Sequence, residues 1–293
     1  MLECQMLLIT RDYAPFISAP FSCAPRFRLD SWENSFKSPS VDSDTRHDLG
    51  RVPGKTGAQW FATTHWSVVL EAGKPGSPQF RAALEELCRT YWLALYSYLR
   101  RYGYNPDDAQ DLTQGFFLRL LRTDSLVGVS PIKGRFRTFL LASMKHFLSD
   151  ERDRARAQKR GGNQTMISID GTQAEEFFLQ LPSGELSPET AFDRRWALTV
   201  LDKAFHRLRL EYTNSGRANL FESLSNFLSN EATAGDYACL APKLGIFEQA
   251  IGVAVHRLRH RYGECVRFEI GKTLTNPEDL NEEMHYLFSL LTG

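Results

Sequence analysis

Residues 107–160 read DDAQDLTQGFFLRLLRTDSLVGVSPIKGRFRTFLLASMKHFLSDERDRARAQKR. The first part of this stretch is acidic and amphipathic, and the part from Lys133 to Arg160 mixes phenylalanines with basic residues. That later part holds nine Lys/Arg against three Asp/Glu, although the whole chain has a formal net charge of +0. The positive charge is therefore concentrated. A basic surface with aromatic rings beside it is typical of proteins that hold a nucleic-acid backbone and stack on opened bases.

The composition predicts an all-α protein of ordinary globular type. The chain has 293 residues, 42% of them hydrophobic and 24% charged, which allows two domains with buried cores. Helix-forming residues dominate, and no long run of alternating β-branched residues favours a strand.

The cysteines and the hydropathy indicate a cytoplasmic protein without a metal or another cofactor. The five cysteines are odd in number and none shares a Cys-x-x-Cys spacing, which argues against a disulfide framework and against a zinc site. No apolar run approaches the roughly 20 residues of a membrane-spanning helix, so no membrane partner is expected.

The spacing of apolar residues predicts two small helical domains joined by a linker. The N-terminal part is rich in proline and has no helical period, so we expect a disordered extension there. The expected boundaries are 1–58 for the extension, 59–162 for the first domain, 163–187 for the linker, 188–275 for the second domain and 276–293 for an acidic C-terminal helix.

In the first domain, one helix is expected to begin near Phe80 and to end at Gly103. Asn105 or the adjacent Pro-Asp-Asp starts the next helix, because these residue types suit a helix N-terminus. A long helix follows over about residues 135–156, with Phe147 in the core. The linker is expected to hold a short amphipathic piece near residues 175–181.

In the second domain, residues 237–261 read YACLAPKLGIFEQAIGVAVHRLRHR and have the spacing of a helix-turn-helix made of two short helices. Ala241 is small, and Gly245 can take the left-handed turn conformation four residues later. The alternative is an ordinary helical hairpin with an arginine-rich end. On the helix-turn-helix register, Gln249, Gly252, Val253 and His256 face a major groove, and Arg257, Arg259, His260 and Arg261 follow near phosphates.

Taken together, these motifs resemble a sigma-70 family RNA polymerase sigma factor, in the two-module form of the extracytoplasmic-function (ECF) subfamily. The resemblance covers about residues 60–274. It rests on the stretches THWSVVL, YSYLRRYGYNPDDAQDLTQ, GRFRTFLLASMKHFLSDERDRARAQKRGG and AVHRLRHRYGE, in that order along the chain.

The resemblance implies three binding surfaces and no catalytic residue, because the polymerase performs the chemistry. Residues 84–122 would bind core polymerase through Asp108, Asp111, Gln114 and Phe117. The expected contacts to the promoter −10 element are Arg135, Phe136, Arg137, Phe139, Lys145, His146, Arg152, Arg154 and Arg156. Those to the −35 element are Gln249, Val253, His256, Arg257, Arg259, His260 and Arg261.

Four positions depart from the family pattern. Gly115 stands where a Glu is usual, Gly252 where a Lys is typical, and Phe247 where a Ser or Thr would cap the helix. Pro242 is expected to shorten the helix that precedes the turn. These departures predict weaker −35 binding and less stable helices without a change of fold.

The leading interpretation is a promoter-specificity subunit with core polymerase and promoter DNA as partners, and an anti-sigma factor is left open. The alternative is a sigma-like DNA-binding regulator that does not support initiation. An enzyme is disfavoured because the chain has no Gly-rich phosphate loop, no His-Glu-x-x-His and no Cys-His cluster. The acidic C-terminal helix is a candidate shield for the basic helix-turn-helix.

Overall fold

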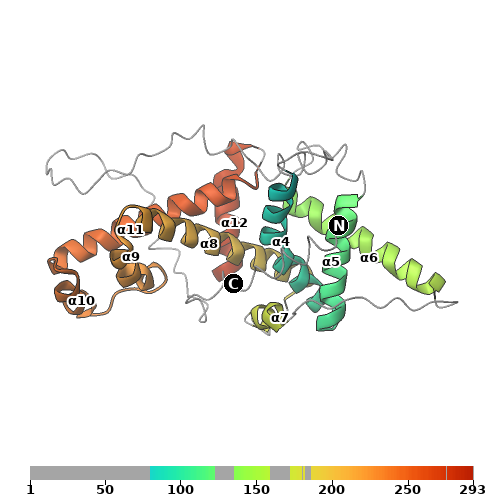
Figure 1. The fold of residues 1–293 in the computed structure, drawn as a ribbon, viewed down its shortest axis with the longest axis horizontal. Helices are drawn as coiled ribbons and strands as arrows, with labels where there is room; N and C mark the ends of the chain where they lie inside the picture. The colour runs from blue at the N-terminus through green and yellow to red at the C-terminus, as the bar shows by residue number, and fades with distance from the viewer. Residues whose placement is uncertain are drawn as a thin grey trace. The chain divides into compact units, whose positions relative to one another are not determined.

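The computed structural model describes residues 80–122, 135–158, 172–179, 181, 186–274 and 276–292, and these are helical with no strand among them (Figure 1). The predicted all-α class is confirmed. The extension predicted over residues 1–58 lies outside the described residues.

Two compact units make up the chain, and the boundary between them falls inside α8, after Thr199. The domain bounds expected from the sequence, with a second domain from residue 188, stay a prediction. The first unit contains α4 (Phe80–Tyr102), α5 (Pro106–Arg122), α6 (Phe136–Gln158), α7 (Thr172–Leu179), the start of α8 (Pro188–Asn214) and η6 (Pro277–Asp279). The second contains the rest of α8, α9 (Ala218–Leu224), η5 (Ser225–Leu228), α10 (Asp236–Leu244), α11 (Glu248–Gly271) and α12 (Leu280–Thr292).

The turn between α4 and α5 forms as its residue types predict. α4 ends at Tyr102, and Gly103 takes a φ of 106°, which L side chains rarely adopt. Asn105 then caps α5, because its Oδ1 accepts a hydrogen bond of 2.8 Å from the Asp108 backbone N–H. The predicted helix end and helix start are both confirmed.

Aromatic rings form much of the core of the first unit. Tyr91 and Phe136 meet edge to face with ring centroids 5.3 Å apart, and Phe116 and Phe147 do the same at 5.8 Å. These pairs join α4 to α6 and α5 to α6. The core position expected for Phe147 is confirmed.

The predicted linker contains α7, which is held against α4 by a charged and aromatic contact. The Glu175 carboxylate accepts hydrogen bonds from Arg100 Nε at 2.7 Å, from Arg100 Nη2 at 2.5 Å and from the Tyr96 hydroxyl at 2.7 Å. The Arg100 guanidinium lowers the pKa of Glu175. Arg101 lies over the Phe178 ring, 5.2 Å from its centroid. Part of the segment is therefore fixed to the first unit, and its helix begins three residues before the expected piece.

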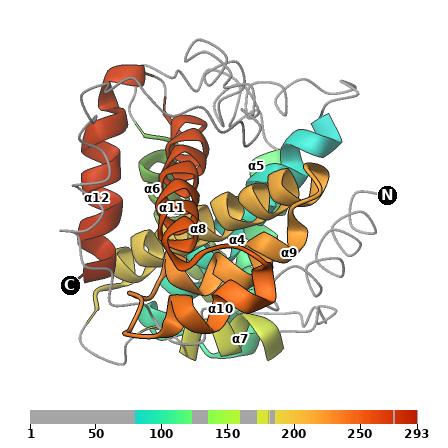
Figure 2. The same ribbon diagram turned by 90° about the vertical axis from the view of Figure 1, so that its left-hand side faces the viewer.

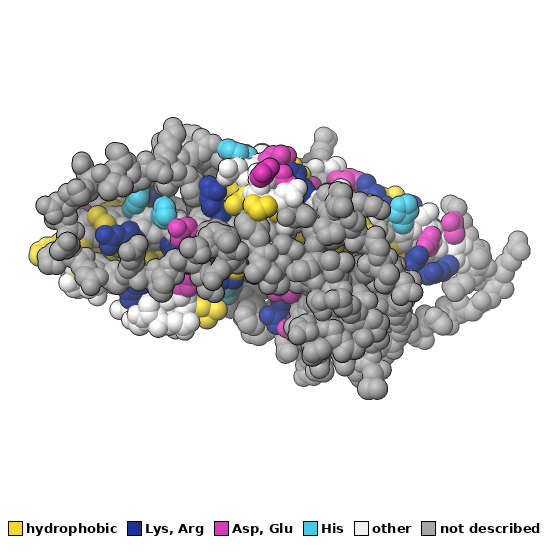
Figure 3. Space-filling model, turned by 90° about the horizontal axis from the view of Figure 1, so that it is seen from above, with side chains coloured by type: hydrophobic (Ala, Val, Ile, Leu, Met, Phe, Trp, Pro, Cys, Tyr) yellow, Lys and Arg dark blue, Asp and Glu magenta, His cyan; other side chains and the backbone are white. Residues whose placement is uncertain are grey.

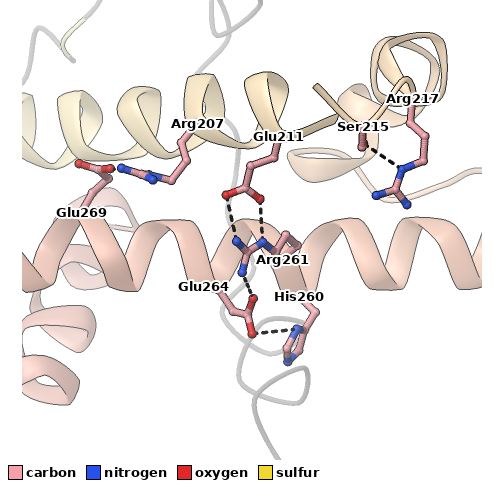
Figure 4. Close-up of polar contacts among 8 residues, drawn as sticks. All are labelled: Arg207, Glu211, Ser215, Arg217, His260, Arg261, Glu264 and Glu269. Atoms are coloured by element: carbon pink, nitrogen blue, oxygen red, sulfur yellow. Dashed lines mark hydrogen bonds and ion pairs between the residues drawn. The ribbon is translucent and has the colours of Figure 1, made fainter. Parts of the chain in front are cut away.

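In the second unit, α8 and α11 run antiparallel and are joined by ion pairs (Figure 4). Arg261 donates from Nε and Nη2 to the two carboxylate oxygens of Glu211, at 2.8 and 2.9 Å. Further along, Arg207 donates to the buried Glu269 at 2.8 Å. Most of the buried residues of α11 lie in its C-terminal half, and the helix has 24 residues. The prediction that it is short is wrong, because this packing extends it.

A three-residue turn separates α10 from α11, and the two helices are bent by 97° to each other. Gly245 begins the turn with a φ of 66°, as predicted. Pro242 lies inside α10, which nevertheless continues to Leu244. The expected shortening at Pro242 is therefore wrong.

The acidic C-terminal helix α12 lies beside α11 (Figure 2). Arg267 donates a hydrogen bond of 3.1 Å to Asn281, and Glu283 is buried. α12 is therefore a packed part of the second unit.

Among the described helices, none alone is long and apolar enough to cross a membrane, whereas the bent pair of α10 and α11 reaches that length and hydropathy when taken together.

Candidate nucleic-acid interface

The first candidate surface is the outer face of α5, where the sequence predicts polymerase contacts. Asp108 and Asp111 lie one helical turn apart on this face. Asp108 is exposed and also accepts a hydrogen bond of 2.8 Å from the Asn105 side-chain amide, so it helps to cap the helix. Asp111 is half-buried, and its burial together with Asp108 and Asp107 raises its pKa. Gln114, further along, is half-buried.

Phe117 does not lie on that surface. Its side chain is fully buried and packs edge to face on Phe116 at 5.7 Å. The contact of Phe117 with the polymerase stays a prediction that needs an exposed ring, and in this structure the ring is buried. The reason is helical geometry, since Phe117 follows the inner face of α5 with Thr113 and Leu120.

Gly115 borders α6. A Cβ built at Gly115 would lie 3.4 Å from the tip of the Phe147 ring, so a side chain here would begin in contact with α6. Gly115, the position where the family pattern has a glutamate, therefore lies where α5 meets α6, at the edge of the acidic face.

The start of α6 is enclosed, in contrast to the sequence expectation. Phe136 is 0% exposed against Tyr91, and Arg137 is 6% exposed. Arg137 pairs with Asp193 at 3.1 Å, and its guanidinium lies 4.7 Å from the Trp196 ring centroid. DNA contacts from Phe136 and Arg137 stay a prediction, and they would need free side chains. In this structure the Phe136 ring fills the core and Arg137 is paired with Asp193 inside the unit.

The rest of α6 is more open. Lys145 and His146 are exposed, Arg135 and Phe139 are half-buried, and Lys145 forms an ion pair of 2.8 Å with Glu189. Arg154 is exposed and forms an ion pair of 2.5 Å with Glu151, one turn before it. The side chain of Arg156 lies outside the described part of the structure.

A small cluster of Tyr102, Tyr104 and Arg152 brings aromatic rings and positive charge together near the end of α6. Tyr102 is exposed and stacks on Tyr104 with centroids 6.0 Å apart. The Arg152 guanidinium lies 5.0 Å from the Tyr102 ring centroid. Sequence analysis missed both tyrosines. The spacing of an aromatic residue on each side of Gly103 was the available signal.

On α11 the structure separates two groups among the predicted −35 residues. Gln249, Val253, His256, Arg257 and His260 are exposed. Arg259 instead donates to the backbone oxygens of Phe227 at 2.9 Å and of Asn230 at 3.0 Å.

Arg261 is the second predicted DNA contact whose side chain is bonded inside the second unit. It is held by Glu211 and Glu264, which raise its pKa (Figure 4). Phosphate contacts from Arg259 and Arg261 stay a prediction, and in this structure each of the two side chains donates to an acceptor inside the second unit.

Gly252 does not point outward as predicted. A Cβ built there would lie 3.7 Å from the Tyr237 ring of α10, so this position faces the preceding helix. Phe247, in contrast, is 83% exposed at the start of α11. Its aromatic side chain at a helix N-cap position was the sequence signal for it.

Within the described residues, no group of three or more His, Cys, Asp or Glu side chains is arranged to hold a metal ion.

Comparison with known families gives one match. Residues 87–159 match the family model of sigma-70 region 2, a span that runs from α4 through α5 and α6. The match supports a place for this chain in the sigma-70 family. No curated protein matches the chain, and no solved structure does.

Proposed function

We propose that this chain is a sigma factor of the two-module, ECF-like type that binds bacterial RNA polymerase core and directs promoter recognition and transcription initiation. The observation that carries the proposal is the match of residues 87–159 to sigma-70 region 2. The proposal assigns no catalytic residue to the chain, places its action in the cytoplasm and leaves an anti-sigma factor open as a further partner.

Polymerase docking is assigned to the acidic outer face of α5. Asp108 and Asp111 supply negative charge there, with Gln114 further along the same helix. Burial and like charges already disfavour the ionised form of Asp111, as its raised pKa indicates. A basic patch on a partner protein would stabilise the ionised form of this carboxylate.

Binding to the −10 element is assigned to the open part of α6 and the adjacent Tyr102–Tyr104–Arg152 cluster. Exposed Lys145 and Arg154 supply positive charge along the helix, and His146 is exposed beside Lys145. An exposed tyrosine beside an arginine offers a ring face on which an unpaired base can stack, at about 1–3 kcal/mol per base.

Reading of the −35 element is assigned to α10, its turn and α11 as a helix-turn-helix. The 97° bend and the three-residue turn beginning with Gly245 support this assignment. Gln249, Val253 and His256 lie on one exposed face of α11, and Arg257 is exposed beside them.

Reconstitution with bacterial core polymerase tests the proposal. The full-length chain is expected to co-purify with core and to start transcription from a subset of genomic fragments. If it does not associate with core, the proposed function is wrong.

The Asp111→Asn variant localises the docking face. A carboxyl whose folded pKa is raised contributes stability below its unfolded pKa and loses that contribution as pH rises through the folded value. Asp111 therefore costs stability at neutral pH, and Asp111→Asn is expected to unfold at a slightly higher temperature while binding core more weakly. Glu176→Gln, at an exposed acid of α7, is the control and is expected to leave core binding unchanged. Unchanged core binding by Asp111→Asn would remove Asp111 from the docking face.

A DNA-binding regulator that does not support initiation is the second candidate. Gly115 favours it, because it stands in place of a family glutamate and a Cβ added there would lie 3.4 Å from the Phe147 ring. Salt-sensitive binding to duplex DNA without core association is the result that selects this candidate.

A further inference from the structure

We propose that the start of α11 recognises thymine methyl groups in the major groove through Phe247 and Val253. The inference rests on the proposed reading of duplex DNA by this helix. It adds the chemical feature that is read and a residue, Phe247, that the family pattern does not assign to DNA.

The two side chains are unusually open for their type. Phe247 is 83% exposed and Val253 is 52% exposed, whereas the neighbouring phenylalanines Phe221 and Phe227 are buried. Phe247 occupies the N-cap of α11 with an extended backbone and makes no side-chain cap hydrogen bond. A polar cap residue would satisfy a backbone N–H there, so the ring neither caps the helix nor fills the core.

The position of these side chains matches the chemistry of base edges. Residues at the N-terminal end of a recognition helix are those that reach base edges in the major groove. The thymine C5-methyl is the apolar group displayed there, and small apolar or aromatic side chains contact it. Val253 lies one turn from the exposed Gln249, so an apolar contact and a hydrogen-bonding amide share one face.

The charges around the patch favour duplex DNA as its occupant. Lys243, Arg257 and His260 are exposed on α10 and α11 and suit flanking phosphates (Figure 3 shows basic, histidine and hydrophobic side chains together at the left-hand end). Glu248 is exposed immediately beside Phe247 and would repel a phosphate at that point. A phosphate is therefore disfavoured beside the ring, and an uncharged base edge suits it better.

Deoxyuridine substitution tests the inference, because it removes the methyl group and keeps base pairing. Duplexes bound by the full-length protein are first selected from a random library. Each thymine of the selected site is then replaced by deoxyuridine, and the Kd is measured. At one or two positions we expect an affinity loss of about fourfold, the value for one buried methyl group.

Phe247→Ser is the informative variant, because serine is a preferred N-cap. It is expected to unfold at a higher temperature than the wild type and to lose the preference for thymine at the position that Phe247 contacts, so a folding defect cannot explain the loss. Val253→Ala should lower the discrimination in the same way. Leu210→Ala, at an exposed leucine of α8 in the same unit, should keep the full fourfold difference.

The possible results separate the inference from the proposed function. If no duplex is selected, the reading of DNA by this helix fails and the inference fails with it. If duplexes are selected but deoxyuridine is tolerated at every position, only the inference is wrong. If Phe247→Ser retains thymine discrimination but loses association with core polymerase, the patch is a protein contact and the inference is overturned.

Discussion

Helices α6 and α11 are similar in length and each carries several arginines, yet they expose opposite ends. α6 has 23 residues, begins with the buried Phe136 and Arg137, and opens toward the exposed Arg152 and Arg154. α11 has 24 residues, begins exposed, and has most of its buried residues in its C-terminal half. The difference shows that a basic stretch of sequence does not always form a basic surface. Where an acceptor packs against an arginine, the arginine stabilises the fold instead of facing solvent.

Arg137 provides the largest expected effect on this comparison. Arg137→Met leaves Asp193 without this partner and removes the cation from the Trp196 face, so we expect a loss of about 3 kcal/mol in the free energy of unfolding. Arg154→Met is the matched change at the open end of α6 and should cost within about 0.5 kcal/mol. Urea denaturation measures both. A stable Arg137→Met protein with weakened DNA binding would show that Arg137 is a surface residue.

Arg261 and Arg257 allow the same comparison of a half-buried and an exposed arginine on α11. Arg261→Met removes the two hydrogen bonds to Glu211, and since the pair is partly exposed we expect a loss of about 1 kcal/mol. Arg257→Met should leave stability unchanged, weaken duplex binding and lower the salt dependence of binding by about one phosphate contact. If Arg261→Met and Arg257→Met change stability and duplex binding to the same extent, the two halves of α11 do not have separate roles.

Gly252 tests how α10 meets the exposed half of α11. The added Cβ of Gly252→Ala would lie in ordinary contact with Tyr237, at 3.7 Å, so the helix preference of alanine should stabilise the protein by about 0.5–1 kcal/mol. Gly245→Ala is the matched control with the opposite sign, because its φ of 66° strains any L side chain. Thermal unfolding compares them. A destabilising Gly252→Ala would mean that Tyr237 lies closer to α11 than described.

The smallest expected effect concerns Lys145, whose amine forms an ion pair with Glu189. Lys145 lowers the pKa of Glu189, so the pair contributes stability above the unfolded pKa, about 4.3, and loses it as pH falls through the lower folded value. Glu189→Gln should cost only a few tenths of a kcal/mol at neutral pH, since both side chains are half exposed. It should also strengthen DNA binding slightly by releasing Lys145. Binding that is unchanged at low salt would show that Lys145 does not face DNA.

The local elements of this protein follow from its sequence. Gly103 and the Asn105 cap set the α4–α5 turn, and Gly245 sets the turn before α11, because these residues act through backbone conformation and hydrogen bonds to near neighbours. Apolar spacing likewise predicts Phe147 in the core. The match to sigma-70 region 2 accords with the motif order read from residues 96–160.

Only the tertiary structure decided which of the predicted site residues are free. The burial of Phe117, Phe136 and Arg137 and the internal bonding of Arg259 and Arg261 depend on partners such as Asp193 and Glu211, which lie some 50 residues or more away in the chain for Arg137 and Arg261. Helical periodicity gives the face of a residue but not what packs on that face. An arginine in sequence predicts charge, and the acceptors brought to it by folding determine whether that charge reaches the surface.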